Sequence, residues 1–460
     1  MEQLSYDHGT SLERLLGTTL GRHFDLVARR RGDNEALVSC PDGVRLTYAA
    51  LKQQVDNFAR GLLRLGVEPG DRVGVWSTNN LQWVICQLAT ASVGSILVNI
   101  NPAYRTAELQ YALNQSGVKV LVAIRGYKAD EYLQMVRQLA PELFQAGSSA
   151  AKRLPALERL VLIAGRSEEA PGVTTFDAVC ALGTTVDPSE LAVVEAGLQF
   201  DDPINIQYTS GTTGFPKGVT LSHHNLLNNA LYAGEAMALD DRSRFCVPMP
   251  FYHCGGMVLC TLATLCRGGT LVIPSPSFDA RAVLSAVESE RCTHISGVPT
   301  MYIEELEQPD FSQFDLSSLK GGFMAGAPCP VELMRRVSEQ MHLQEIVIFY
   351  GLTECSPVIT STTIHDSLEV RASTVGRAIP HMELKIVDPA SGKVVPRGAQ
   401  GEILARGYAV MLGYWNNPEA THEAIDAAGW LHTGDLGVMS ESTYVHITGR
   451  KKDMVIRGGE

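Results

Sequence analysis

The chain has 460 residues, of which 45% are hydrophobic and 19% are charged, and its formal net charge is −12. A chain of this length is too long to fold around a single hydrophobic core, so we expect about three domains. The composition is that of an ordinary globular protein. The acidic balance argues against a general nucleic-acid-binding protein, which would need a basic face.

The cysteines and the hydropathy of the sequence indicate the cellular compartment of the protein. The ten cysteines are scattered without a Cys-x-x-Cys pair, so free thiols in a reducing compartment explain them better than a zinc site. The first residues show no secretory signal. The longest uncharged apolar stretch, 83–100, contains Gln87, Thr90 and Ser92, which favours a buried helix and strand over a membrane span. We therefore expect a cytoplasmic protein with no transmembrane segment.

The first 200 residues alternate between helix and strand patterns. Ser11 could cap a helix over 15–24, residues 35–38 and 44–47 predict a hairpin, and Thr47 precedes another helix. Strands are then expected at 73–76, 96–98, 118–124 and 160–163, with helices at 81–92, 106–114 and 129–139 between them. This rhythm predicts a parallel sheet with crossover helices.

The alternation restarts after residue 200 and ends near residue 374. Strands are expected at 204–208, 245–249, 271–273, 294–296, 322–324 and 345–349. Shorter runs at 383–387, 401–405 and 443–447, punctuated by turn residues, predict a small antiparallel β-barrel. The predicted fold class is α/β, with parallel-sheet subdomains at 1–200 and 201–374 and a β-barrel subdomain at 375–448.

Residues 208–218 read Tyr-Thr-Ser-Gly-Thr-Thr-Gly-Phe-Pro-Lys-Gly, an unusual density of glycines and hydroxyl groups after a predicted strand. Glycine lets backbone N–H groups turn toward an anion, and Lys217 adds a mobile positive charge. The Walker A pattern does not fit, because Pro216 precedes the lysine and Gly218 follows it. We interpret the segment as a polyphosphate-binding loop; the alternative is a flexible linker.

Three more glycine-rich or polar clusters, at 250–256, 325–328 and 350–354, also follow predicted strands. In open α/β sheets, ligands bind outside the carboxyl ends of the strands. We therefore expect these clusters and the polyphosphate loop to meet along one edge of the second layer.

Four runs together resemble the AMP-forming adenylating superfamily, which includes acyl-CoA synthetases, adenylation domains of peptide synthetases and luciferases. They are 209–217, Tyr-Gly-Leu-Thr-Glu at 350–354, Gly-Trp-Leu-His-Thr-Gly-Asp at 429–435 and Gly-Arg-Lys-Lys-Asp at 449–453. The resemblance covers essentially the whole chain and is closest in texture to medium-chain fatty acyl-CoA synthetases. It implies ATP-dependent conversion of a fatty acid to acyl-AMP with release of pyrophosphate, then transfer to coenzyme A, with Mg²⁺ as cofactor.

The resemblance also implies roles for individual residues. Tyr350 would stack on adenine, with Gly351 beside it and Gly326, Ala327 and Pro328 opposite. Thr353 would bind the α-phosphate, Glu354 would bind Mg²⁺, Asp435 the ribose hydroxyls, and Arg450 the ribose or a phosphate. The phosphate loop would comprise Thr209, Ser210, Gly211, Thr212, Thr213, Gly214, Phe215, Pro216 and Lys217. The expected catalytic residues are Thr353, Glu354, Lys217 and His253, the last beside the acyl carboxylate.

Each residue has an ordinary alternative when taken alone. Glu354 suits a first helical turn, Asp435 a turn, Tyr350 a core, and a lone histidine such as His253 is more often structural. Other functions also stay open: an aryl-acid CoA ligase, an enzyme that loads a carrier-protein thiol, or a nucleotide-binding protein without catalysis. A homodimer is compatible with these readings.

Residues 449–460 correspond to the hinge and the start of a mobile C-terminal domain in the resembled family, where that domain supplies a lysine for adenylation. The sequence ends at Glu460, eight residues after Lys452. The expectation is a large domain without this lid, which would adenylate slowly and form the thioester poorly.

Overall fold

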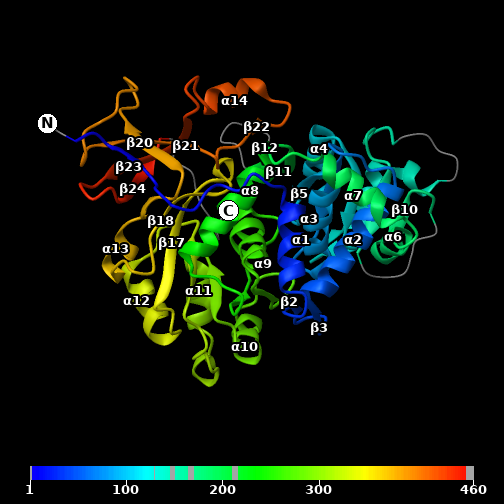
Figure 1. The fold of residues 1–460 in the computed structure, drawn as a ribbon, viewed down its shortest axis with the longest axis horizontal. Coiled ribbons are helices and arrows are strands. Elements are labelled where there is room, and N and C mark those ends of the chain that lie inside the picture. Colours follow the sequence, from blue (N-terminus) through cyan, green and yellow to red (C-terminus); the bar gives the residue numbers. More distant parts are fainter. Residues whose placement is uncertain (1–2, 129, 146–150, 164–169, 210–215, 452–460) are drawn as a thin grey trace.

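The computed structural model describes residues 3–128, 130–145, 151–163, 170–209 and 216–451. Within these residues the strands form sheets of eight, nine and five strands, with a two-stranded ribbon of β7 (Gly126–Tyr127) and β8 (Asp130–Glu131). Figure 1 shows the first part of the chain, blue to cyan, on one side of the molecule and the green and yellow segments on the other. The two α/β layers and the antiparallel part predicted from the sequence are present.

The eight-stranded sheet is parallel except at one edge. Its order is β10 (Val173–Thr175), β9 (Arg159–Leu162), β6 (Val118–Ala123), β4 (Arg72–Trp76), β5 (Ile96–Ile100), β11 (Pro203–Thr209), β12 (Lys217–Ser222) and β22 (Gly413–Tyr414). Strand β11 pairs in parallel with β5 through Asn205 and Leu97. The expectation that 204–208 belongs to the second layer is therefore wrong, because the chain returns to the first sheet before it crosses over.

The nine-stranded sheet likewise contains a segment from elsewhere in the chain. Its order is β19 (Arg377–Ala378), β18 (Val358–Ser361), β17 (Glu345–Gly351), β16 (Gly321–Ala325), β15 (His294–Gly297), β13 (Arg244–Cys246), β14 (Thr270–Ile273), β2 (Glu35–Ser39) and β3 (Val44–Thr47). The early hairpin β2–β3 joins it by pairing Leu37 with Leu271. The limits at 200, 374 and 448 stay predictions as domain boundaries, since strand pairing does not show which segments fold independently.

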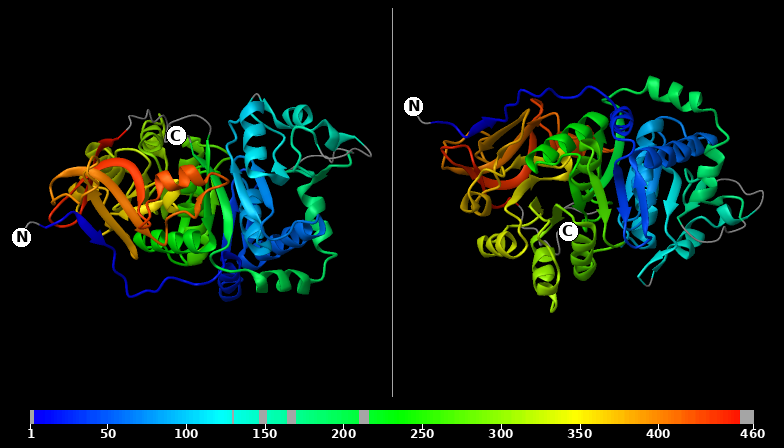
Figure 2. Two further views of the ribbon diagram at one scale, coloured as in Figure 1. Left: turned by 90° about the horizontal axis from the view of Figure 1, so that it is seen from above. Right: turned by 60° about the horizontal axis from the view of Figure 1, so that its bottom comes forward.

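The five-stranded sheet is antiparallel throughout, in the order β1 (Tyr6–His8), β20 (Met382–Val387), β21 (Gln400–Gly407), β23 (Leu431–Met439) and β24 (Val445–Arg450). Its described pairings leave β1 and β24 at the edges, so the predicted small antiparallel unit is an open sheet. Both views of Figure 2 show the blue N-terminal segment running from this sheet to α1.

Helices connect and cover these sheets, and most begin at the polar residues that cap them. They are α1 (Leu20–Arg30), α2 (Tyr48–Arg64), α3 (Leu81–Val93), α4 (Thr106–Ser116), α5 (Tyr132–Leu139), α6 (Phe176–Gly183), α7 (Pro188–Gly197), α8 (His223–Ala236), α9 (Ala263–Arg267), α10 (Ala280–Glu290), α11 (Pro299–Leu306), α12 (Val331–Gln340), α13 (Leu368–Ser373) and α14 (Pro418–Ala424). Thr47 caps α2 as predicted, its hydroxyl accepting from Ala50 N at 3.2 Å.

The predicted helix at 15–24 starts later than expected, at Leu20, and Thr19 rather than Ser11 is its cap. The preceding residues instead run along α8, where Leu16 N donates to Asn228 Oδ1 at 2.8 Å. His223, the first residue of α8, accepts from Leu20 N at 3.1 Å. One continuous cluster of buried apolar side chains joins α1, α3, α8 and all three sheets.

Candidate functional site

The polyphosphate loop leaves the eight-stranded sheet between two paired strands. Thr209, the last residue of β11, lies opposite Lys217, the first of β12. The predicted binding residues Ser210, Gly211, Thr212, Thr213, Gly214 and Phe215 lie outside the described residues. The loop's far end is braced by α4, because Tyr111 Oη donates to the Pro216 carbonyl at 3.1 Å. Both ends of the predicted loop are therefore held at a defined place.

The part of β11 that precedes the polyphosphate loop is held by a buried polar network. Gln207 Nε2 donates to Asn205 Oδ1 at 2.9 Å and to Met257 Sδ at 3.6 Å. Asn99 Nδ2 donates to the Tyr252 carbonyl at 2.9 Å. Because buried polar groups must find partners, this network fixes the loop strand relative to the turn that carries His253.

The predicted adenine walls come from neighbouring parallel strands. Met324 of β16 lies opposite Ile348 of β17, so the segment 326–328 and Tyr350 leave the same edge of the nine-stranded sheet. Gly326 has φ of +81°, and an added Cβ would come within 3.2 Å of Val298 Cγ1. These positions suit the approach of a flat ring, and adenine stacking there stays a prediction.

Asp435 lies at the centre of one group of contacts. Its Oδ2 accepts from Tyr350 Oη at 2.8 Å, and its Oδ1 pairs with Arg450 Nε at 2.9 Å. Adjacent strands place the pair, since Asp435 of β23 lies opposite Arg450 of β24. Burial raises the pKa of Asp435, and the tyrosine hydroxyl and the guanidinium partly offset this. Three residues predicted for the nucleoside are thus in direct contact.

Glu354 lies at the centre of a second group. It belongs to the 3₁₀ helix η4 (Thr353–Cys355), immediately after β17, and its carbonyl accepts from Met411 N at 2.8 Å. Its Oε1 accepts from Tyr414 Oη at 2.8 Å. Burial raises the pKa of Glu354; the Tyr414 hydroxyl and the charge of Lys217 act in the opposite direction. Lys217 Nζ lies 4.9 Å from the centre of the Tyr414 ring.

Tyr414 was not anticipated from the sequence. It lies in β22, a strand of only two residues, which has too few positions for a detectable alternation of apolar and polar side chains. Its neighbour in the sheet is Val219 of β12, two residues after Lys217. That long-range pairing brings Tyr414 to the site.

His253 is exposed and stands just before the π-helix η2 (Gly255–Leu262). Its Nδ1 accepts from Gly255 N at 3.3 Å. Burial raises the pKa of the next residue, Cys254, and the carboxylate of Glu354 raises it further. A contact between His253 and the acyl carboxylate stays a prediction.

The residues present fit Mg²⁺ better than a metal held by protein ligands alone. The described residues contain no group of three or more His, Cys, Asp or Glu side chains arranged to hold a metal ion. Mg²⁺ commonly takes one or two carboxylates and completes its shell with water and substrate phosphates. Tyr414 Oη bonds Oε1 of Glu354, and Oε2 would be the oxygen that binds such an ion.

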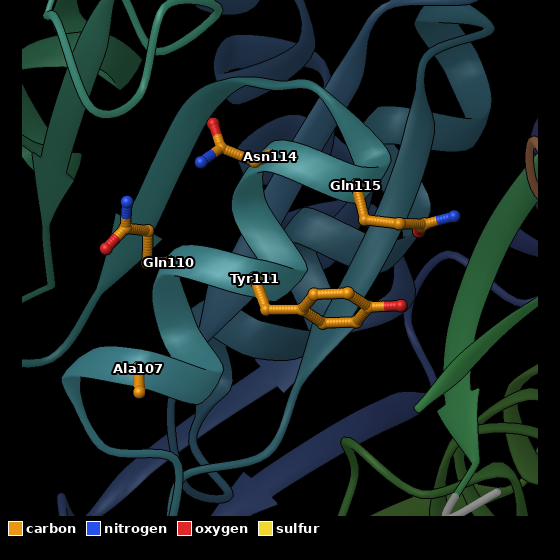
Figure 3. A pocket seen from close by; sticks show the side chains of 5 residues that line it. All are labelled: Ala107, Gln110, Tyr111, Asn114 and Gln115. Carbon is orange, nitrogen blue, oxygen red and sulfur yellow. The ribbon is translucent and has the colours of Figure 1, made fainter. Parts of the chain in front are cut away.

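A separate open depression of about 530 Å³ lies on α4. Figure 3 shows Tyr111 and Gln115 extending toward one side of this helix and Gln110 and Asn114 toward the other. Ala107 completes the lining, which contains no charged side chain. Gln115 Nε2 donates to the Trp415 carbonyl at 2.6 Å, so one residue of the lining connects α4 to the residue that follows Tyr414.

No helix among the described residues combines the length and apolarity needed to cross a bilayer. The predicted cytoplasmic location is a separate expectation, which this finding does not test.

Comparisons with known proteins agree with this arrangement. A family described as AMP-binding enzyme matches residues 24–415. "Medium-chain acyl-CoA ligase ACSF2, mitochondrial" of Homo sapiens is 42% identical over 464 residues, covering 99% of this chain and 75% of the relative. The solved anthranilate CoA ligase AuaEII, in complex with anthranoyl-AMP, aligns with a TM-score of 0.83 and 26% identity over 97% of this chain and 80% of its own. The N-terminal domain of FACL13 from Mycobacterium tuberculosis aligns with a TM-score of 0.79 and 26% identity, covering 94% of this chain and 100% of that domain.

Proposed function

This chain belongs to the AMP-binding enzyme family, and we propose that it is an ATP-dependent acyl-CoA synthetase for medium-chain fatty acids. The predicted superfamily and α/β fold class are confirmed by the family match and by the solved structures. Relatives in this family join a carboxylic acid to CoA at the expense of ATP. The substrate class rests on the 42% identity to a medium-chain ligase.

The observation that carries the proposal is the meeting of five predicted residues in two linked groups. Tyr350 and Arg450 contact Asp435, while Tyr414 contacts Glu354 and lies under Lys217. Only three residues separate Tyr350 from Glu354 in the sequence, so the two groups are adjacent. Two carboxyl groups and two cations so arranged suit a nucleotide with its metal ion.

Each residue then has a defined task. Asp435 accepts the ribose hydroxyls, Tyr350 lies against adenine, and Thr353 and Lys217 donate to the phosphate oxygens. A carboxylate oxygen of the fatty acid attacks the α-phosphorus, the bond to pyrophosphate breaks, and acyl-AMP forms. The CoA thiolate then attacks the acyl carbon and AMP leaves. Positioning and charge stabilisation supply the rate, and Mg²⁺ at Glu354 would neutralise phosphate charge.

A covalent cysteine intermediate is not part of this mechanism. Cys254 and Cys355 lie beside Glu354, but both are buried and burial raises the pKa of each thiol. A thiol with a raised pKa carries little thiolate and is a poor nucleophile.

The test measures acyl-AMP, pyrophosphate and acyl-CoA separately by mass spectrometry and a coupled assay, with butanoate, octanoate, hexadecanoate and benzoate as substrates. We expect the highest kcat/KM with octanoate. A preference for benzoate would favour the aryl-acid ligase, toward which the AuaEII likeness points. Acyl-AMP transferred to a carrier protein but not to CoA would favour carrier loading. Calorimetric binding of Mg–ATP without any acyl-AMP would indicate a protein that binds nucleotide without catalysis.

A further inference from the structure

We propose that Tyr414 is a positioning residue that holds Glu354 and Lys217 apart and in register, each with a neutral partner. The inference rests on the proposed function and assigns a role to a residue that touches neither predicted substrate group. One side chain makes both contacts: the hydroxyl donates to Glu354 Oε1 at 2.8 Å, and the ring lies 4.9 Å from Lys217 Nζ.

The backbone around Tyr414 is fixed to the strand that carries Lys217. Trp415 N donates to the Gly218 carbonyl at 2.7 Å, and Leu412 N donates to the Thr220 carbonyl at 2.9 Å. These bonds hold both flanks of Tyr414 against β12. The ring therefore has little freedom to move relative to Lys217.

The same segment is also fixed to the other sheet. Met411 N donates to the carbonyl of Glu354, which follows β17 of the nine-stranded sheet. Residues 411–415 therefore join the two sheets at the site. Lys217 lies in the eight-stranded sheet and Glu354 follows a strand of the nine-stranded sheet, so some element must set their separation, and Tyr414 is the side chain that contacts both.

Lys217 and Glu354 are proposed to bind a phosphate and a cation, so each must keep its charge available for that ligand. Among the described residues, the structure shows no ion pair for either Glu354 or Lys217, although the charge of Lys217 acts to lower the pKa of Glu354. A direct pair would use the carboxylate oxygen and the ammonium group that a cation and a phosphate require. A phenol hydroxyl and an aromatic face stabilise the two charges without neutralising them.

The alternative is that Tyr414 only fills space, since its ring packs against the main core. In that case the hydroxyl would be dispensable. Tyr414→Phe separates the two possibilities, because it keeps the ring over Lys217 and removes only the bond to Glu354. Tyr414→Leu removes both contacts.

Calorimetric titration with ATP in the presence of Mg²⁺, and again with EDTA, provides the first readout. We expect Tyr414→Phe to weaken Mg–ATP binding on the order of 10-fold, the usual effect of losing a residue that orients a metal ligand, with metal-free ATP binding unchanged. Tyr414→Leu should also weaken metal-free binding, because Lys217 loses its position. The Mg²⁺ concentration for half-maximal pyrophosphate release should rise in parallel.

Tyr444 provides a matched control within the same chain. Its hydroxyl also donates to a carboxylate, Asp366, and Arg377 lies 4.8 Å from its ring centre, but none of these residues belongs to the site. Tyr444→Phe should leave both titrations unchanged. A second control places Tyr414→Phe in a Glu354→Gln background, where the loss of Mg–ATP affinity should disappear.

The outcomes separate this inference from the proposed function. If the unaltered chain binds Mg–ATP and Tyr414→Phe binds it equally well, Tyr414 has no positioning role and the ligase assignment stands. An equal loss of metal-free binding in Tyr414→Phe would also overturn the inference, since the hydroxyl would then not act through the metal site. If the unaltered chain neither binds Mg–ATP nor forms acyl-AMP, the proposed function fails and this inference fails with it.

Discussion

The two ends of the candidate site contain the same kind of carboxyl–tyrosine contact, but the negative charge of each carboxyl group has a different positively charged neighbour. Each has a carboxyl group, buried at Asp435 and half-buried at Glu354, that accepts from a tyrosine hydroxyl at 2.8 Å: Asp435 from Tyr350, and Glu354 from Tyr414. Asp435 also pairs with Arg450 at 2.9 Å. At Glu354 the cation, Lys217, lies over the tyrosine ring instead.

The difference fits what each end is proposed to bind. Ribose hydroxyls are neutral, so Asp435 can keep its Arg450 partner while it accepts hydrogen bonds from them. A divalent cation needs an uncompensated carboxylate, and an ion pair at Glu354 would compete with it. Burial raises the pKa of both groups, so desolvation is common to the two ends and the partner distinguishes them.

The largest effect is expected at the phosphate end. Glu354→Gln removes the charge but keeps the shape and the bond to Tyr414, and pyrophosphate release should fall on the order of 10²–10³-fold, as when one group that stabilises transition-state charge is lost. Metal-free ATP binding should persist in calorimetry. Glu345→Gln, at the amino end of β17, the strand that precedes Glu354, is the control and should retain activity. Near-normal turnover in Glu354→Gln would show that this end needs no charge.

A smaller effect, mainly on affinity, is expected at the ribose end. Asp435→Asn removes a charged acceptor and leaves Arg450 without its carboxylate partner, so the KM for ATP should rise roughly 10- to 100-fold. Because the contact is to ribose hydroxyls, the variant should also lose the ability to distinguish ATP from 2′-deoxy-ATP or 3′-deoxy-ATP. Steady-state kinetics with the three nucleotides checks this. Unchanged discrimination would place the ribose elsewhere.

Local patterns in the sequence predicted most strands and placed the candidate site residues at strand ends, while the sheet to which two segments belong was not predictable. Strand β11 was recognised as 204–208 and the hairpin β2–β3 as 35–47, but each pairs with a sheet from another part of the chain. A strand is recognised from a few adjacent residues, whereas its partner depends on the path of the whole chain. Tyr414 was not predicted for the same reason, because its place at the site depends on the pairing of β22 with β12.

A carboxyl group elsewhere in the molecule, that of Glu305, lacks, in the part of the chain that the structure describes, the hydrogen-bond partners that Asp435 and Glu354 have. Glu305 of α11 is 1% exposed, and neither carboxyl oxygen has a hydrogen-bond partner among the described residues. Because an unsatisfied buried polar group is costly, Glu305→Leu should raise the free energy of unfolding by about 1–3 kcal/mol, measured by urea denaturation. Glu304→Leu, at an exposed position on the same helix, is the control and should change stability little.

The smallest expected effect is the pH dependence of the stability gained by Glu305→Leu. Burial raises the pKa of Glu305 well above its ordinary value of 4.5, so the folded protein holds this proton more tightly than the unfolded chain does. Its contribution is therefore fully present below pH 4.5 and is lost as the pH rises toward the folded-state pKa. The advantage of Glu305→Leu should accordingly grow with pH over this interval. A constant advantage would mean that Glu305 ionises as freely as a solvated carboxyl group. The proposed cost of a buried carboxyl group that lacks the partners of Asp435 and Glu354 would then be wrong.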